Sequence, residues 1–234
     1  AAITTAKANA EKNLQNAREL FESYLQSVFA NRGAGWEERK LGEVCVIERG
    51  SSPRPIKEFF TNKDNGVNWI KIGDTKNVDK YIYSTSEKIT PEGAKQSRFV
   101  KEGDFILSNS MSFGRPYIMK TQGYIHDGWF VLRLQTFIDT EYFWYLLASP
   151  FTRNQFEKLA SGAIVKNINS DLVKKAILPI PPLSNQHLIV AKLDSLSSET
   201  KKLEAIYQKK LADLEELKKS ILQKAFDGEL TEAQ

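Results

Sequence analysis

The chain has 234 residues, of which 41% are hydrophobic and 26% are charged, and its formal net charge is +4. This length and composition are typical of a soluble globular protein with one ordinary domain plus an extension, or with two small domains. No apolar run approaches the roughly 20 residues of a membrane-spanning helix, no basic-then-apolar secretory start is present, and the lone Cys45 excludes an internal disulfide framework. The sequence therefore predicts a cytoplasmic protein without a membrane partner.

The first predicted element is a helix over residues 3–30, within a helical segment that we assign to residues 1–33. Its apolar side chains recur at alternating spacings of three and four, so they share one stripe of the helix. The stripe consists of Leu14, Ala17, Phe21, Tyr24 and Val28. The glycines at positions 33 and 35 end the pattern.

Residues 34–183 are predicted to form a mixed α/β module, because short apolar runs alternate with turn-rich pieces. Helices are expected from a cap at Asp139 to about residue 149, from Pro150 to about residue 159, and from a cap at Asn169 or Ser170 through residue 174. The expected strands are Leu41–Ile47, Val67–Ile72, Phe105–Leu107, Tyr117–Met119 and Trp129–Leu134.

A proline-rich segment, Leu178–Leu183, is predicted to be a stiff extended hinge before a helix of about 40 residues over 184–228. The tail over 229–234 is expected to fray. Apolar residues of this long helix keep the 3-4 heptad spacing, and a narrow stripe on so long a helix needs a partner helix. The first helix is the obvious candidate. The predicted pairing residues of the long helix are Leu193, Leu196, Leu203, Tyr207, Leu214, Leu217 and Ile221.

The two helices also resemble each other in sequence. Lys12–Phe29 and Lys209–Phe226 superimpose with a constant shift, and 8 of 18 positions are identical. Solenoid repeats recur every few tens of residues, so this long period indicates a globular module carried between two equivalent helices. The arrangement favours a measuring or adaptor protein over a stand-alone catalyst.

The familiar signatures of catalytic and metal sites are absent from the sequence. There is no glycine-rich phosphate loop, no G-x-G-x-x-G and no G-x-S-x-G elbow. One cysteine and two distant histidines, His126 and His187, offer no zinc-like spacing, so no metal site is predicted. Residues 36–183 hold 21 Lys and Arg against 17 Asp and Glu, a mild basic bias that suits a polyanion.

Six segments in order give the chain a family resemblance. They include WIKIGD at Trp69–Asp74, ITPEGAK at Ile89–Lys95 and IPPLSNQHLIVAKLDSL at Ile180–Leu196. The others are Trp36–Gly50, Lys101–Leu107 with Ser112–Ile118, and Ser161–Asn169. The ordered set resembles half of a type I restriction-modification specificity subunit, and it covers essentially the whole chain. Asn185 stands where that family usually has Glu, a change that affects a helix cap.

The resemblance implies an α+β fold in which one mixed α/β target-recognition domain is flanked by two long helices that pair as an antiparallel coiled coil. It implies a non-catalytic subunit that reads one half of a split target in double-stranded DNA. It also implies adenine methyltransferase (modification) and restriction subunits as partners. No cofactor is expected in the chain itself, because S-adenosylmethionine, ATP and magnesium would belong to those partner subunits.

Side chains that read or hold DNA are expected to be polar or basic and to lie on loops carried by a rigid sheet. Four loops meet this description. The candidate DNA-binding residues are Ser52, Arg54 and Lys57; Asp74, Thr75, Lys76 and Asn77; Ser108, Asn109, Ser110, Ser112 and Arg115; and Lys166 and Asn167.

Two other interpretations stay open at this stage. The chain could be the recognition segment of a fused methyltransferase-endonuclease, or a coiled-coil scaffold whose α/β domain reads no DNA. With one recognition domain instead of two, we expect either a dimer that forms through the helices or a part of a longer subunit.

Overall fold

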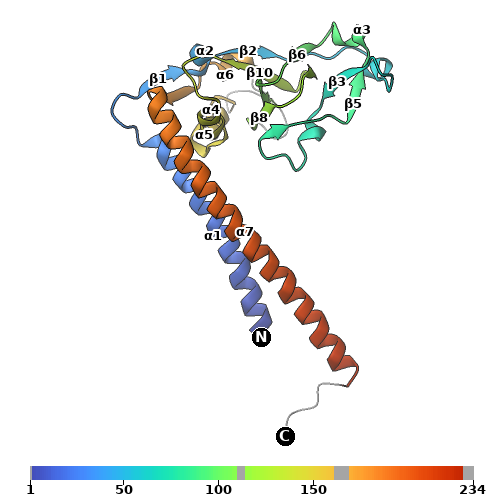
Figure 1. Cartoon of the computed structure of the whole chain (residues 1–234), viewed down its shortest axis with the longest axis vertical. Coiled ribbons are helices and arrows are strands. Elements are labelled where there is room, and N and C mark those ends of the chain that lie inside the picture. The colour runs from blue at the N-terminus through green and yellow to red at the C-terminus, as the bar shows by residue number, and fades with distance from the viewer. Residues whose placement is uncertain (1, 110–113, 161–168, 229–234) are drawn as a thin grey trace. The chain divides into compact units, whose positions relative to one another are not determined.

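The computed structural model describes residues 2–109, 114–160 and 169–228, and the chain divides into two compact units (Figure 1). One unit consists of the two long helices, up to Ser27 and from Ala191 onward, and the other is Val28–Val190. The second unit, called the module below, carries all the β-strands among the described residues. The expected fold class, α+β with a mixed module and two long flanking helices, is confirmed.

The long helices are α1 (Ala2–Ala30) and α7 (Leu183–Phe226), and they lie side by side in opposite directions (Figure 1). Residues early in α1 contact residues late in α7, and the reverse holds at the other end. Lys7 Nζ is 3.0 Å from Glu215 Oε2, Arg18 Nε is 3.3 Å from Glu204 Oε1, and Lys192 Nζ is 5.3 Å from the centre of the Tyr24 ring. Exposed ion pairs of this kind contribute little each, so the apolar stripe is the main attraction between the helices.

Most of the predicted pairing residues are covered. Leu193 is buried, and the half-buried ones are Leu14, Phe21, Tyr24, Val28, Leu196, Tyr207 and Leu214. Three of the predicted residues are not. Leu203, Leu217 and Ile221 are 45%, 48% and 39% exposed, so α1 leaves much of their surface uncovered and their pairing stays a prediction.

The geometry of the helix pair explains why these three side chains are exposed. The covered positions of α7 run through Glu204 and Leu211, so Leu203 lies one residue, about 100° of helix rotation, away from the contact line. Since Lys7 lies level with Glu215, residues 217 and 221 of α7 reach the first described turn of α1, where little remains to cover them.

The module is built on a five-stranded sheet in the order β2-β10-β7-β8-β4. Its neighbours are antiparallel, except that β4 runs parallel to β8. The strands are β2 (Cys45–Arg49), β4 (Tyr81–Ile82), β7 (Phe105–Ser108), β8 (Pro116–Met119) and β10 (Trp129–Leu134).

A second sheet of four strands has the order β5-β3-β9-β6, with β3 and β9 parallel. Its strands are β3 (Val67–Ile70), β5 (Glu87–Ile89), β6 (Arg98–Val100) and β9 (Gly123–Ile125). Two short helices, η1 (Ile56–Phe59) and α3 (Pro91–Ala94), adjoin it, and Phe59 packs with Trp69 and Ile89 in a small apolar cluster on this sheet.

The main core lies between the two sheets. Alternate residues of each strand point into it, as the period of two in a β-strand requires. The core cluster consists of Ile70, Val100 and Ile125 from the four-stranded sheet and Ile82, Ile106, Tyr117, Met119, Trp129 and Val131 from the five-stranded sheet. The intervening side chains of β7, β8 and β10 are also buried, and Phe105 meets Phe143 edge to face at 5.1 Å.

The face of the five-stranded sheet that points away from the main core is covered by helices. They are α4 (Thr140–Ala148) and α5 (Pro150–Ala160), close to their predicted ranges. Asp139 caps α4 by accepting a hydrogen bond from the Tyr142 backbone N–H, as predicted. The short helix α6 (Ser170–Val173) is capped by Asn169, one of the two predicted caps.

Three sequence predictions in the module need correction. The expected strand Leu41–Ile47 begins as a helical turn, α2 (Leu41–Val44), and only then becomes β2. The expected strand Val67–Ile72 ends at Ile70 and is followed by a 3-10 turn, η2 (Ile72–Thr75).

The third correction concerns the proline-rich hinge, which is extended as predicted up to Ile180 but is paired as a strand. Its first part is a strand, β11 (Ile177–Ile180), which pairs antiparallel with β1 (Glu37–Lys40). Pro179 has no N–H to donate, which a two-stranded sheet tolerates because each strand is an edge. The long helix then begins at Leu183, within the segment predicted to be extended.

Candidate nucleic-acid interface

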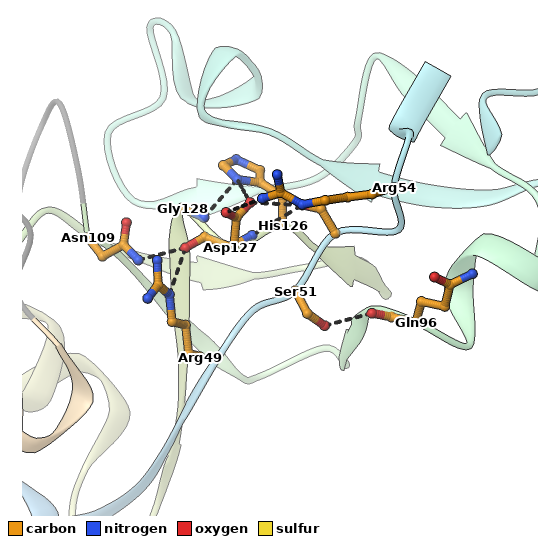
Figure 2. A network of polar contacts seen from close by, with 9 residues as sticks. Arg49, Ser51, Arg54, Gln96, Asn109, His126, Asp127 and Gly128 are labelled. Atoms are coloured by element: carbon orange, nitrogen blue, oxygen red, sulfur yellow. Dashed lines mark hydrogen bonds and ion pairs between the residues drawn. The ribbon is translucent and has the colours of Figure 1, made fainter. Parts of the chain in front are cut away.

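A turn between β9 and β10, residues 126–128, joins polar side chains from separate segments of the module (Figure 2). The Asp127 side chain accepts a hydrogen bond from Ser52 Oγ at 2.9 Å and lies 3.5 Å from Arg54 Nη2. Its backbone carbonyl accepts from Asn109 Nδ2 at 2.7 Å and from Arg49 Nε at 3.1 Å. Asp127 thereby joins three segments that are far apart in the sequence. We call Asp127 and these four partners the Asp127 network.

The loop Gly50–Pro55, which follows β2, is tied to this turn along its length. Its backbone starts with two hydrogen bonds, from Gly50 N–H to the Trp129 carbonyl at 2.8 Å and from Ser51 N–H to the Ile125 carbonyl at 3.3 Å. A Cβ at position 50 would lie 2.0 Å from the His126 carbonyl oxygen, so only glycine allows this approach. Loop and turn therefore form one packed surface.

The loop also contacts the turn that precedes β6. Ser51 Oγ donates to the Gln96 carbonyl at 2.8 Å (Figure 2). At the start of β6, Arg98 Nε reaches the Arg49 carbonyl at 3.5 Å. Gln96 and the cationic side chains of Arg49 and Arg98 are exposed, so they extend the polar surface around the loop. The sequence analysis did not select any of these three residues as a candidate for DNA binding. Arg49, a basic residue at the end of a predicted strand, was the one that the sequence pattern could have indicated.

The pKa values of Asp127 and His126 both lie below their ordinary values. Burial by itself would raise the pKa of the Asp127 carboxyl, but the hydrogen bond from Ser52, a backbone hydrogen bond and the nearby His126 and Arg54 outweigh it, and the pKa is lowered. Burial lowers the pKa of His126, more than Asp127 and Asp74 raise it, and Lys71 lowers it further. The Nδ1 of His126 accepts from the Gly128 N–H at 2.8 Å, as a neutral imidazole can.

The predicted DNA-binding residues of the first loop differ in exposure. The Arg54 side chain is 81% exposed, Lys57 is exposed on η1, and Ser52 is half-buried in its hydrogen bond to Asp127. The side chains of Arg54 and Lys57 are therefore open to solvent, whereas Ser52 holds the loop to Asp127.

In the second loop, too, some of the predicted residues are exposed and others are held inside the loop by hydrogen bonds. Lys76 and Asn77 are exposed, and Asn77 has a left-handed backbone with φ of 66°. The Asp74 carboxylate accepts hydrogen bonds from the Lys71 N–H and from both the N–H and hydroxyl of Ser86. Thr75 is buried and donates to the Ile72 carbonyl.

The third loop is partly inside the protein. Ser108 and Asn109 are 0% and 3% exposed, and both are hydrogen bonded to neighbouring segments. Arg115 is exposed, but its guanidinium donates to the Val78 carbonyl at 3.1 Å and lies 5.5 Å from the centre of the Tyr117 ring. The predicted residues Ser110, Ser112, Lys166 and Asn167 lie outside the described residues.

The described residues contain no group of three or more His, Cys, Asp or Glu side chains that could hold a metal ion. Within the same residues, no helix combines the length and the apolar character needed to cross a membrane. Cys45 is buried, and burial raises the pKa of its thiol to about 12, so a reactive thiolate is disfavoured.

Comparison with known proteins identifies relatives along most of the chain. The family profile of the type I restriction modification DNA specificity domain matches residues 33–215. The type I restriction enzyme EcoKI specificity subunit of Escherichia coli (strain K12) is 25% identical over 216 residues, which cover 85% of this chain and 44% of that protein. The chain therefore spans less than half the length of this relative.

Two solved structures share the fold. A chain from a study of complex assembly and conformational transition of the type I R-M system aligns with a TM-score of 0.82 and 23% identity, covering 96% of this chain and 55% of that one. The HsdS subunit from Thermoanaerobacter tengcongensis aligns with a TM-score of 0.70 and 24% identity, covering 98% and 55%.

Proposed function

Since the chain belongs to the family of type I restriction-modification DNA specificity domains, we propose that it recognises one half of a split DNA target as the specificity component of such a system. The proposal gives the chain no catalytic step of its own. Methylation and cleavage are assigned to partner subunits, which would bind S-adenosylmethionine, ATP and magnesium.

One observation on the molecule carries the proposal. The Gly50–Pro55 loop is fixed to the module by backbone and side-chain hydrogen bonds, yet it leaves the Arg54 guanidinium open to solvent. Arginine can grip guanine with two hydrogen bonds in the major groove, and a fixed loop holds it in register. Lys57, three residues further along the chain, and Lys76, on the second predicted loop, are exposed and suit phosphates.

Eight of the predicted contact residues divide into two groups. Arg54, Lys57, Lys76 and Asn77 are proposed to face DNA, because their side chains are exposed. Thr75, Ser108 and Asn109 are buried and Asp74 is bound to backbone N–H groups, so we assign these four to holding the loops instead.

The helical unit is proposed to set the distance between two recognition modules. A single module reads one half-site, so a split target needs a second module on another copy or another chain. The antiparallel contacts of α1 with α7 support a rigid spacer. The alternative of a recognition segment in a fused methyltransferase-endonuclease predicts that catalytic domains precede the module in the same polypeptide.

The decisive experiment is methylation mapping. The chain is combined with the modification subunit encoded beside it, S-adenosylmethionine and unmethylated DNA, and the modified adenines are located by sequencing. Methylation at an interrupted palindrome is expected if two copies pair, because a symmetric reader requires a symmetric site. A folded complex that methylates no defined sequence would contradict the proposal.

A further inference from the structure

Asp127, at the centre of the Asp127 network, was not among the residues selected from the sequence, and the family comparison assigns it no role. We propose that Asp127 is a positioning residue, which holds the Gly50–Pro55 loop so that Arg54 is presented to one DNA base position. This inference rests on the proposed function. It adds a role for a carboxylate that would itself repel DNA.

The contacts of Asp127 are arranged to fix the loop from two sides. Its Oδ1 accepts from Ser52 Oγ at 2.9 Å, and its Oδ2 lies 3.5 Å from Arg54 Nη2. One carboxylate therefore restrains the Ser52 side chain and orients the guanidinium two residues later. Arginine loses much rotamer freedom when it is ordered, so an arginine oriented before binding pays less of that cost on the DNA.

Asp127 is itself held firmly. Its carbonyl accepts from the side chains of Asn109 and Arg49, and Asn109 is almost fully buried with its own N–H bonded to the Gly128 carbonyl at 3.0 Å. Gly128 is close to the His126 ring, where a Cβ would lie 2.3 Å from Cε1. The turn thus cannot shift without disturbing buried contacts, which makes it a suitable anchor.

The charge of Asp127 argues that its role is positional. A carboxylate beside a DNA-binding arginine opposes phosphate binding, so it weakens general affinity for DNA. About half of the side chain is exposed, so its removal would not leave a buried cavity. A residue that lowers general affinity is expected to be useful only if it improves discrimination between sequences.

The test compares base preferences, position by position. The full chain, in complex with its modification subunit, selects from a pool of randomised DNA duplexes, and the bound fraction is sequenced. The variants are Arg54→Ala, Asp127→Ala, the double variant, and Asp127→Asn, which keeps an acceptor for Ser52. Asp64→Asn removes one exposed negative charge elsewhere on the module and is the matched control for charge.

We expect Asp127→Ala to lose about 10-fold in discrimination at the same base position as Arg54→Ala, since one good base contact is worth roughly that factor or more. The double variant should lose no more than Arg54→Ala alone, and Asp127→Asn should recover part of the loss. Asp64→Asn should keep the wild-type discrimination at that position, because it removes a negative charge without changing the Asp127 network.

Two results would overturn the inference. Asp127→Ala could keep the wild-type preferences, or it could weaken all positions together with a lower melting temperature, which is the behaviour of a residue that only stabilises the fold. A wild-type complex that enriches no sequence at all would instead contradict the proposed function, so the two failures are distinguishable.

Discussion

Arg54 and Lys57 lie three residues apart and are expected to act on DNA in different ways. Arg54→Ala should cost about 1–3 kcal/mol at one base position and relax the preference there. Lys57→Ala should weaken all sequences alike and reduce the slope of log affinity against log salt by about 1, because one phosphate contact is lost. Titrations of cognate and scrambled duplexes at several salt concentrations separate the two effects.

Lys63, an exposed lysine in the turn before β3, is the control for these variants. Lys63→Ala should leave the cognate-to-scrambled ratio and the salt slope unchanged. Equal behaviour of Arg54→Ala and Lys57→Ala, with no loss at any single base, would remove Arg54 from the reading role.

His126 gives the module a pH-dependent stability. Its folded-state pKa lies below the ordinary value of 6.5, so the unfolded chain takes up a proton first as the pH falls. The contribution of the neutral ring is fully present above pH 6.5 and is lost progressively as the pH falls from there through the folded-state pKa. Asp127, Asp74 and Lys71 are the charged groups that act on it.

Chemical denaturation at pH values from 8 to 5 checks this prediction. The free energy of unfolding should decrease more steeply for the wild type than for His126→Gln, which has no proton to gain at this position. A difference between the two proteins that is constant over the whole range would mean that the His126 pKa is not lowered by folding.

At the scale of elements, the strands that the sequence predicted well are those buried on both faces. β7, β8 and β10 face the inter-sheet core with one set of side chains and are buried on the other face as well, so they appear as continuous apolar runs. The strands β5, β6 and β9 have only three residues each and include charged or glycine positions. No periodicity can be recognised over so short a stretch.

The strand pairing of the proline-rich segment was missed for a related reason. Pairing between β1 and β11 joins residues about 140 positions apart, so it cannot be predicted from the local composition of either strand. The same limit applies to the site. Loops rich in Ser, Asn and Arg were found, but the contacts that bury Ser108 and Asn109 and make Asp127 an anchor come from distant segments.

Gln186 shows how the start of α7 is fixed to the module. Its side chain is fully buried, accepts a hydrogen bond from the Asp139 N–H at 2.7 Å, and donates to the Phe137 and Pro181 carbonyls at 3.2 and 2.9 Å. Gln186→Ala leaves these backbone groups without their partner. We expect it to lower the free energy of unfolding by about 2–3 kcal/mol, since buried polar groups without partners are costly.

Ser184, exposed on the same first turn of α7, is the control for that variant. Ser184→Ala should change the free energy of unfolding by no more than about 0.5 kcal/mol. Urea denaturation of both variants checks the prediction, and an equal, small effect at the two positions would show that the Gln186 hydrogen bonds are replaced by water.

At the scale of the whole molecule, the repeated helix predicts self-association. Phe29 in the first copy of the repeat is fully buried and meets the Tyr142 ring at 5.7 Å, whereas its equivalent, Phe226, is 87% exposed. Leu217 and Ile221, four residues apart on one face of α7, are also exposed. A second copy could cover these apolar side chains and supply the second module that the proposed function requires.

The prediction is that Leu217→Glu combined with Ile221→Glu weakens self-association without unfolding the chain. Each side chain is already about half covered, so covering the rest contributes about half of the roughly 1.5–3 kcal/mol of full burial. In a symmetric dimer each of the two substitutions counts twice, for a total of about 3–6 kcal/mol, so the dissociation constant should rise by about 100-fold or more. Sedimentation equilibrium over a range of concentrations measures it. Leu188→Glu, at an exposed leucine near the other end of α7, is the control and should dissociate as the wild type does. A wild-type chain that remains monomeric at all concentrations would exclude pairing between copies, and the second half-site would then have to be read by a module of another chain.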